Sequence, residues 1–175
     1  LKKLKNEKVK IEENEGSDAT VYIAITNKIS IGNLRNSYTR IQTIAHECLH
    51  SVQKRKMQVF NFIYSNIYLL YFVIVTILAI LNKLQDSMLY IAIMILFSYI
   101  YYFVRSYLEN DAMIKAQFLA REYMQESKYI DNSEIDKIYH GFEELNKSCI
   151  KSTNCSLFIG IMIKLVIFNV LALIF

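Results

Sequence analysis

The sequence predicts a mainly α-helical membrane protein with a small β-hairpin near its N-terminus. Of the 175 residues, 54% are hydrophobic, and the apolar residues are concentrated in three blocks. Each block approaches the roughly 20 residues that an α-helix needs to span a bilayer core. Before the first block, apolar and polar residues alternate as they do in strands. We expect residues 1–175 to form a single membrane domain.

The N-terminal part of the chain predicts a charged tail followed by the hairpin. Residues 1–18 mix lysines with acidic residues and are expected to be a solvated helix or tail. Within residues 19–33, the run from Ala19 to Ile25 alternates in strand fashion and is separated from Ile29-Ser30-Ile31 by Thr26-Asn27-Lys28. Two such runs joined by turn residues predict a β-hairpin.

Residues 35–56 predict an amphipathic helix that carries an unusual histidine pair. The stretch has no Gly or Pro, Ser37 is a candidate N-cap, and apolar residues recur at helical spacing. Residues 46 to 50 read His-Glu-Cys-Leu-His, an HExxH motif that contains two of the three histidines in the chain.

The HExxH motif is typical of catalytic zinc sites, for a physical reason. Residues four apart share one face of a helix, so His46 and His50 can reach one metal ion. Such a site uses three protein ligands and activates a water molecule, from which Glu47 is placed to take a proton. Cys48 points about 200° away from either histidine and is expected in the core. The alternative is a chance match, with both histidines solvated or bonded to carboxylates.

The apolar blocks cover residues 57–81, 87–107 and 157–175. Only five residues separate the first two, so they are expected to form an antiparallel transmembrane hairpin. The third predicts a C-terminal transmembrane helix. Lys164 and Asn169 interrupt this third block. Two alternatives therefore stay open: the block packs against the hairpin, or it lies at the membrane interface.

A hairpin of two spans returns the chain to the side on which HExxH lies. Residues 108–129 are expected to continue the second helix, and the first acidic residue to emerge is Glu109, the candidate third ligand. Asp111 could bond a ligand imidazole and fix its tautomer. The alternative for Glu109 is a juxtamembrane acid on a solvated helix. Glu122 and Glu126 are rival ligands that would need a longer reach.

A further helix is predicted over residues 133–147, with a capping-box start at Ser133-Glu134-Ile135-Asp136. His140 on this helix and Tyr123 on the preceding one are candidates to stabilise the oxyanion that forms when water attacks a peptide carbonyl. For His140 the alternative is a surface or packing role, and Tyr123 is one of 13 tyrosines.

Together these parts resemble a known family. The run Ile44-Ala45-His46-Glu47-Cys48-Leu49-His50-Ser51-Val52-Gln53, a transmembrane hairpin and then Glu109-Asn110-Asp111-Ala112-Met113-Ile114-Lys115-Ala116 resemble the bacterial neutral zinc metallopeptidases of the membrane-embedded gluzincin type. A related pattern occurs in the heat-shock membrane endopeptidases and CAAX prenyl proteases. The resemblance covers residues 27–120. The chain departs from it at Cys48-Leu49, where a small residue and glycine are frequent, and at Met113, where the heat-shock and prenyl-protease relatives carry an aspartate.

The resemblance implies a zincin-like catalytic helix and a membrane-bound zinc endopeptidase with one Zn²⁺ per chain. His46, His50 and Glu109 would hold the metal, and Glu47 would activate water. It also implies that an edge strand of the N-terminal hairpin receives a peptide or protein substrate as an added strand. The sequence itself shows only a hairpin, for which a structural role is equally open.

The distribution of positive charge predicts the orientation. All but two of the 20 Lys and Arg residues lie before the first span or between Arg105 and Lys151; the exceptions are Lys83 and Lys164. The positive-inside rule then predicts a multi-pass protein of the cell membrane with the site facing the cytoplasm. Lys54-Arg55-Lys56 reads as a membrane-flanking cluster, so the expected partner is the lipid bilayer and not nucleic acid. On a reducing cytoplasmic face the three cysteines are expected to be free thiols.

Two other classes of function have some support in the sequence. A non-catalytic membrane scaffold or degenerate metallopeptidase relative could still bind zinc, but a structural site has no use for a general base at Glu47. A small transporter or channel would need polar spans, and no charged residue lies between Ile67 and Leu81. The sequence specifies neither the substrate nor the oligomeric state.

Overall fold

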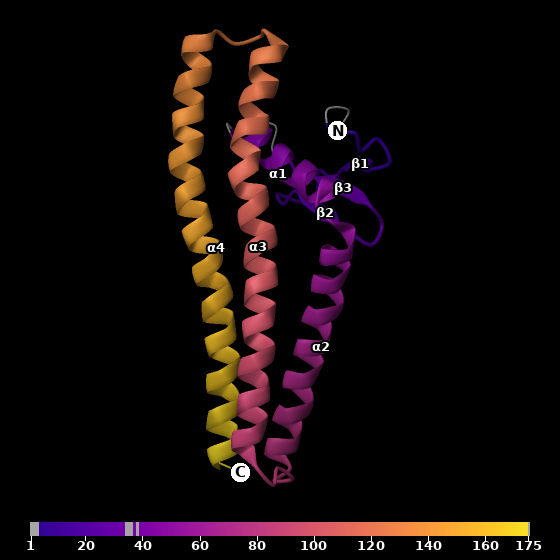
Figure 1. The fold of residues 1–175 in the computed structure, drawn as a ribbon, viewed down its shortest axis with the longest axis vertical. Coiled ribbons are helices and arrows are strands. Elements are labelled where there is room, and N and C mark those ends of the chain that lie inside the picture. The colour runs from indigo at the N-terminus through magenta and orange to yellow at the C-terminus, as the bar shows by residue number, and fades with distance from the viewer. Residues whose placement is uncertain (1–3, 34–36, 38, 175) are drawn as a thin grey trace. The chain divides into compact units, whose positions relative to one another are not determined.

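A computed structural model describes residues 4–33, 37 and 39–174. Along this part of the chain, three strands precede four helices (Figure 1). The chain divides into two compact units, each described separately below. The first unit contains Leu1–Val59 and Leu108–Lys151, and the second contains Phe60–Tyr107 and Ser152–Phe175. The elements are β1 (Lys10–Glu13), β2 (Val21–Ile23), β3 (Lys28–Ile31), α1 (Arg40–Val52), α2 (Arg55–Ile80), α3 (Ser87–Ser127) and α4 (Asn132–Ile174).

The predicted hairpin is present in the first unit. Strands β2 and β3 pair in antiparallel fashion, with Tyr22 opposite Ile29. The turn between them places Asn27 at φ 50°, a left-handed conformation that Asn adopts more readily than most residues. Ile29 is buried against Val9 and Cys48, which fixes the face of the sheet that covers α1.

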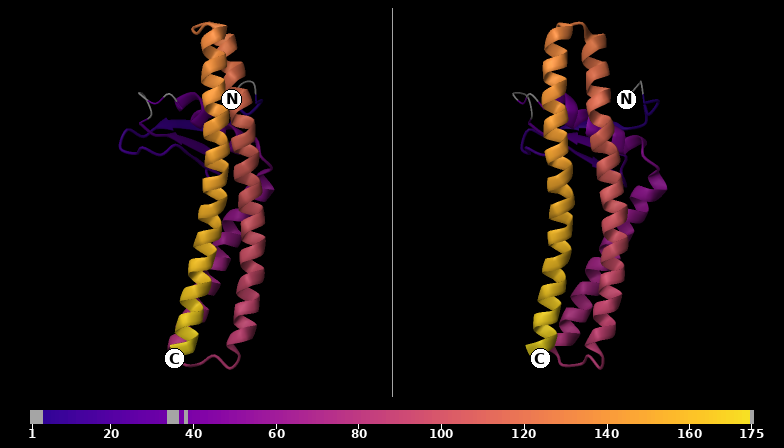
Figure 2. Two further views of the ribbon diagram at one scale, coloured as in Figure 1. Left: turned by 90° about the vertical axis from the view of Figure 1, so that its left-hand side faces the viewer. Right: turned by 60° about the vertical axis from the view of Figure 1, so that its left-hand side comes forward.

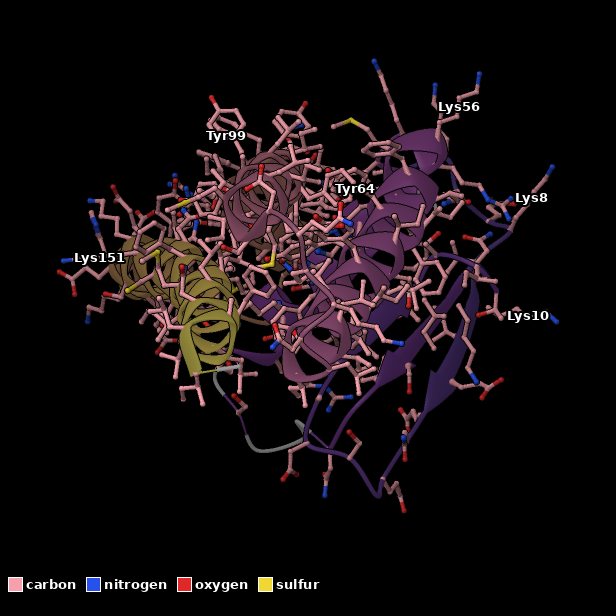
Figure 3. The ribbon with its side chains drawn as sticks, turned by 90° about the horizontal axis from the view of Figure 1, so that it is seen from below. Lys8, Lys10, Lys56, Tyr64, Tyr99 and Lys151 are labelled. Atoms are coloured by element: carbon pink, nitrogen blue, oxygen red, sulfur yellow. The ribbon has the colours of Figure 1, made fainter. Side chains whose placement is uncertain are left out.

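The sheet has a third strand that was not predicted. Strand β1 lies within the segment expected to be a solvated helix or tail, and it pairs in parallel with β3, Lys10 opposite Lys28, in the order β1-β3-β2. All four residues of β1 are exposed, so its sequence has no buried apolar face to signal a strand. Figure 3 shows Lys8 and Lys10 extending away from the sheet. The strand is held by its backbone pairing and by the ion pair of Glu12 with Lys28.

Helix α1 is shorter than the helix predicted over residues 35–56. Residues 34–36 and 38 lie outside the described part, and α1 begins at Arg40 after Thr39. The Ser37 side chain does not cap it but bonds the Thr39 hydroxyl at 2.7 Å. At the other end Gln53 is extended (φ −60°, ψ 155°) and donates its N–H to the carbonyls of Leu49 and His50, which ends the helix before α2 begins.

Within the described residues, three helices are long and apolar enough to span a membrane. They are α2, α3 and α4, with mean hydropathies of 2.1, 1.9 and 2.6 over their most apolar windows. The predicted span at 57–81 coincides with α2 to within a few residues, and the predicted spans at 87–107 and 157–175 lie within α3 and at the C-terminal end of α4. Helix α3 continues to Ser127, close to the predicted end at residue 129. The chain is therefore a membrane protein by the length and composition of its helices.

The two helices predicted over 133–147 and 157–175 are one. Helix α4 runs through 43 residues without interruption. The stretch between the two predicted segments, residues 148–156, contains polar residues but no Gly or Pro, so nothing in it ends a helix. At its start the Asp131 carbonyl accepts hydrogen bonds from the N–H groups of Glu134 and Ile135, both at 2.9 Å.

Each unit has its own core. In the first, Ala45 and Leu49 of α1 pack with Ala112, Ala116 and Ala120 of α3. A helix of 13 residues is marginal alone, so this packing holds α1 in place. In the second, Tyr68, Val75, Met94 and Phe168 form a core shared by α2, α3 and α4, segments that lie close together in both views of Figure 2. The C-terminal part of α4 thus packs against the hairpin.

Candidate metal centre

Helices α1 and α3 bring His46, His50 and Glu109 together in the first unit. The Nε2 atoms of the two histidines are 3.0 Å apart. Each lies 3.5 Å from Oε2 of Glu109. These are the three residues that the sequence nominated as ligands, although 59 positions separate His50 from Glu109 along the chain.

Local structure explains how the three side chains converge. Positions 46 and 50 are one turn apart on α1, and their rings meet edge to face with centroids 4.5 Å apart. Glu109 precedes Ala112 by one turn on α3, and Ala112 is completely buried in the contact with α1. Because alanine side chains are short, the two helices pack closely at this point and Glu109 reaches the histidines.

The donor set and its spacing fit a zinc ion. Zinc binds imidazole nitrogen and carboxylate oxygen at about 2.0–2.2 Å in tetrahedral geometry, which places any two ligand atoms roughly 3.3 Å apart. The observed separations of 3.0, 3.5 and 3.5 Å bracket that value. All three ligand atoms lie within 4.8 Å of one another. A zinc ion held by these two imidazoles and one carboxylate would keep a fourth position for water or substrate, as in catalytic zinc sites.

Glu47 lies beside this group without belonging to it. Its side chain is 8% exposed, and Oε2 accepts a 2.6 Å hydrogen bond from the backbone N–H of Tyr22. Burial raises the pKa of the Glu47 carboxyl. The two histidines and the Tyr22 N–H lower it, but burial is the larger effect, so the pKa lies above the ordinary value for glutamate. Since β2 is an edge strand and the Tyr22 N–H is directed at Glu47, this amide faces away from β3.

Gln53 contributes contacts to the group that the sequence analysis did not assign. Its Oε1 lies 2.9 Å from Nδ1 of His50. Its Nε2 donates to the Leu108 carbonyl at 2.8 Å and to Oδ2 of Asp111 at 3.1 Å. The only sequence signal was its position three residues beyond HExxH, noted as part of the resemblance without a role.

Asp111 therefore does not make the bond to an imidazole for which it was nominated, because Gln53 stands between them. Its Oδ1 pairs with Lys115 at 2.5 Å. Burial raises the pKa of Asp111, but the hydrogen bonds from Lys115 and Gln53 outweigh that effect and hold it below the ordinary value. For His50, burial lowers the pKa, and the Glu109 carboxylate 3.5 Å from Nε2 more than offsets that effect.

The remaining nominated residues lie elsewhere on the surface. Tyr123 is 58% exposed, and the His140 side chain is 80% exposed with Nδ1 3.9 Å from Glu143. Glu122 and Glu126 are also exposed. Among the described residues the metal-ligating group consists of His46, His50 and Glu109 and includes none of these four.

Cys48 lies on the opposite side of α1 from the histidines, as expected. It is buried with Val9 and Ile29, and burial raises the pKa of its thiol. Cys149 and Cys155 on α4 are likewise unpaired.

Comparison of the chain with known protein families, curated proteins and solved structures finds no match.

Proposed function

We propose that the protein is a membrane-bound, zinc-dependent endopeptidase similar to the membrane-embedded gluzincins. The observation that carries the proposal is the spacing of three ligand atoms from two helices, at 3.0, 3.5 and 3.5 Å. A group of this composition supports one zinc ion per chain, held by His46, His50 and Glu109.

The residues around the group suit peptide hydrolysis. Bound zinc polarises a carbonyl and makes water nucleophilic near neutral pH. Glu47 accepts a proton from the attacking water and delivers it to the amide nitrogen as the C–N bond breaks, which yields a carboxylate and an amine. Burial raises the pKa of this carboxyl above the ordinary value for glutamate, which is the direction that favours a group that both accepts and returns a proton.

The edge of the sheet suits an extended peptide as substrate. Strand β2 has β3 on one side, and on the other its Tyr22 N–H is directed at Glu47. A peptide that added to this edge would run beside the carboxyl that handles the proton. This supports a substrate that is extended and unfolded at the cleaved bond.

The charge distribution supports a site on the cytoplasmic face of the cell membrane. Lysine and arginine cluster before α2 and between Arg105 and Lys151, whereas Lys83 stands alone at the turn between α2 and α3. The bilayer is then the permanent partner of the chain.

The proposal is tested by zinc stoichiometry at neutral pH on detergent-purified protein freed of loosely held metal. The parent is expected to retain about one zinc, and His46→Ala and Glu109→Ala are expected to lose it. Glu122→Ala is the matched control, because Glu122 is an exposed carboxyl on the same helix and was the rival ligand. A parent without zinc would refute the peptidase, and a Glu109→Ala variant that keeps zinc would refute the third ligand.

A hydrolysis assay distinguishes a peptidase from a scaffold that only binds zinc. The zinc-loaded parent is expected to cleave quenched fluorescent peptides from a random library or an unfolded protein such as reduced casein. If it holds zinc but cleaves neither, the non-catalytic scaffold is the correct reading.

A further inference from the structure

We infer that Gln53 is a positioning residue that fixes the tautomer of His50 and joins the helices that supply the candidate ligands. The inference rests on the proposed zinc site and adds a determinant of its metal affinity. Gln53 is the residue at which α1 ends, and its extended backbone separates it from the helical face that carries His46 and His50.

The neighbours of Gln53 fix the orientation of its carboxamide. One end lies beside the Leu108 carbonyl and an Asp111 carboxylate oxygen. Both are acceptors, so only the NH₂ group can stand there. The carbonyl oxygen of the amide is then the atom that faces Nδ1 of His50 at 2.9 Å.

This orientation determines which ring nitrogen of His50 carries the proton. An amide oxygen can only accept, so Nδ1 of His50 must donate. In the neutral ring the lone pair then resides on Nε2, the atom 3.0 Å from Nε2 of His46 and 3.5 Å from Glu109. The hydrogen bonds of Gln53 with Leu108, Asp111 and His50 thus leave Nε2 of His50 without a proton and able to bind a metal.

The same side chain links three helices of the first unit. Leu108 and Asp111 flank Glu109 on α3, so Gln53 ties the end of α1 to the segment that carries the third ligand. From the first turns of α2, Gln58 donates to the His50 carbonyl and, at 3.4 Å, to Oε1 of Gln53. Only a carboxamide of this length accepts at one end and donates twice at the other.

The first test measures zinc affinity by competition with a chromophoric chelator. Removing a hydrogen-bond partner of a metal-ligating histidine typically costs 10–100-fold in affinity. Gln53→Ala is therefore expected to weaken zinc binding about 10–100-fold. Gln125→Ala, the same substitution at an exposed position on α3, is expected to leave it unchanged. A Gln53→Ala variant within twofold of the parent, with Gln125→Ala also unchanged, would overturn the inference.

The second test reads the tautomer directly in metal-free protein. With only three histidines, ¹⁵N-histidine labelling gives assignable ring signals, and exposed His140 serves as an internal reference for an unconstrained ring. At a pH where the ring is neutral, His50 is expected to carry its proton on Nδ1 in the parent and to approach the mixture of His140 in Gln53→Ala. An Nδ1–H signal that persists in Gln53→Ala would contradict the inference even if zinc affinity fell.

A double variant tests the link to Asp111. Gln53→Glu sets a carboxylate against Asp111 and the Leu108 carbonyl, and is expected to weaken zinc binding. Adding Asp111→Asn restores a donor between the two side chains and is expected to recover part of the affinity. No recovery would remove Asp111 from this set of hydrogen bonds. If the parent binds no zinc, the peptidase proposal fails, and the tautomer measurement alone decides the role of Gln53.

Discussion

At the scale of single residues, Glu47 differs from the three candidate ligands beside it in the direction of its side chain. His46, His50 and Glu109 face one another, whereas Glu47 is turned to the backbone N–H of Tyr22 on the sheet. Its carboxyl is buried and its pKa raised, chiefly by burial. Under the proposed function, Glu47 accepts a proton and does not hold the metal, and the two roles can be separated by substitution.

Glu47→Gln is expected to keep about one zinc per chain and to lower peptide hydrolysis at least about 100-fold, because general base catalysis contributes roughly 10²–10⁴-fold. The carboxamide keeps the size of the side chain and an oxygen that can accept from Tyr22. Zinc content and initial rates are measured on the same preparations. Glu122→Gln is the control, and rates equal to the parent in Glu47→Gln would refute the assigned role.

The sequence could predict that His46, His50 and Glu109 would lie together, but not the contacts that support them. HExxH specifies two imidazoles through helical spacing alone, and the return of the hairpin specifies Glu109. Gln53 could not be assigned a role, because its contacts require the helix to end there and α3 to lie alongside. Without those facts, Gln53 is one more polar residue on a predicted helix that ran to residue 56.

At the scale of elements, the contact between α1 and α3 decides whether the ligands meet. Ala112, Ala116 and Ala120 repeat every four residues along α3 and are at most 1% exposed where α1 packs. Small side chains at this spacing form a narrow ridge on one face of the helix. Any enlargement of that ridge would displace α1, and the histidines with it.

Ala116→Leu is expected to destabilise the protein by about 1–3 kcal/mol through overpacking. It is also expected to weaken zinc binding, because His46 and His50 move away from Glu109. Thermal unfolding followed by circular dichroism and chelator competition measure the two effects. Gln125→Leu introduces the same side chain at an exposed position of α3 and should change neither. Unchanged stability and affinity in Ala116→Leu would refute the close packing.

The continuity of α4 gives a second prediction at this scale. Ser152→Pro is expected to cost about 3 kcal/mol or more, because proline inside a helix removes a hydrogen bond and clashes with the preceding turn. Ser133→Pro lies in the first turn of α4, where proline is tolerated, and is the matched control. Thermal unfolding in detergent distinguishes them. Equal stability of the two variants would mean that α4 is interrupted within residues 148–156.

Elements with a local pattern were predictable, and those fixed by distant contacts were not. The β2–β3 hairpin and the apolar helices follow from alternation and from long hydrophobic runs. Strand β1 has an exposed, charged sequence and exists because β3 offers it a pairing edge. The polar residues 148–156 suggest two helices where α4 is one, because polar residues do not end a helix when Gly and Pro are absent.

At the scale of the whole molecule, three helices are long and apolar enough to span a membrane. Three spans place the N-terminal residues and the turn between α3 and α4 on the same side of the bilayer. The turn between α2 and α3 and the C-terminus then lie on the other. We predict from the concentration of positive charge on the first side that it faces the cytoplasm.

This topology predicts the labelling of single cysteines by a membrane-impermeant thiol reagent in intact cells. In a background of Cys48→Ser, Cys149→Ser and Cys155→Ser, the Lys83→Cys variant is expected to react without permeabilisation. Lys10→Cys and Ser133→Cys are expected to react only after permeabilisation. Both are exposed, so a lack of reaction in intact cells reports sidedness and not burial. The reverse pattern would invert the orientation.

The short link between α1 and α2 limits where cleavage could occur. Only Gln53 and Lys54 separate the two helices. His50 and Arg55 are five residues apart, a stretch of chain that reaches at most about 18 Å even when fully extended. His50, and any zinc ion that it held, would therefore stay close to the start of α2. Under the proposed function, a peptide bond would be cleaved only where it comes close to the start of this apolar helix.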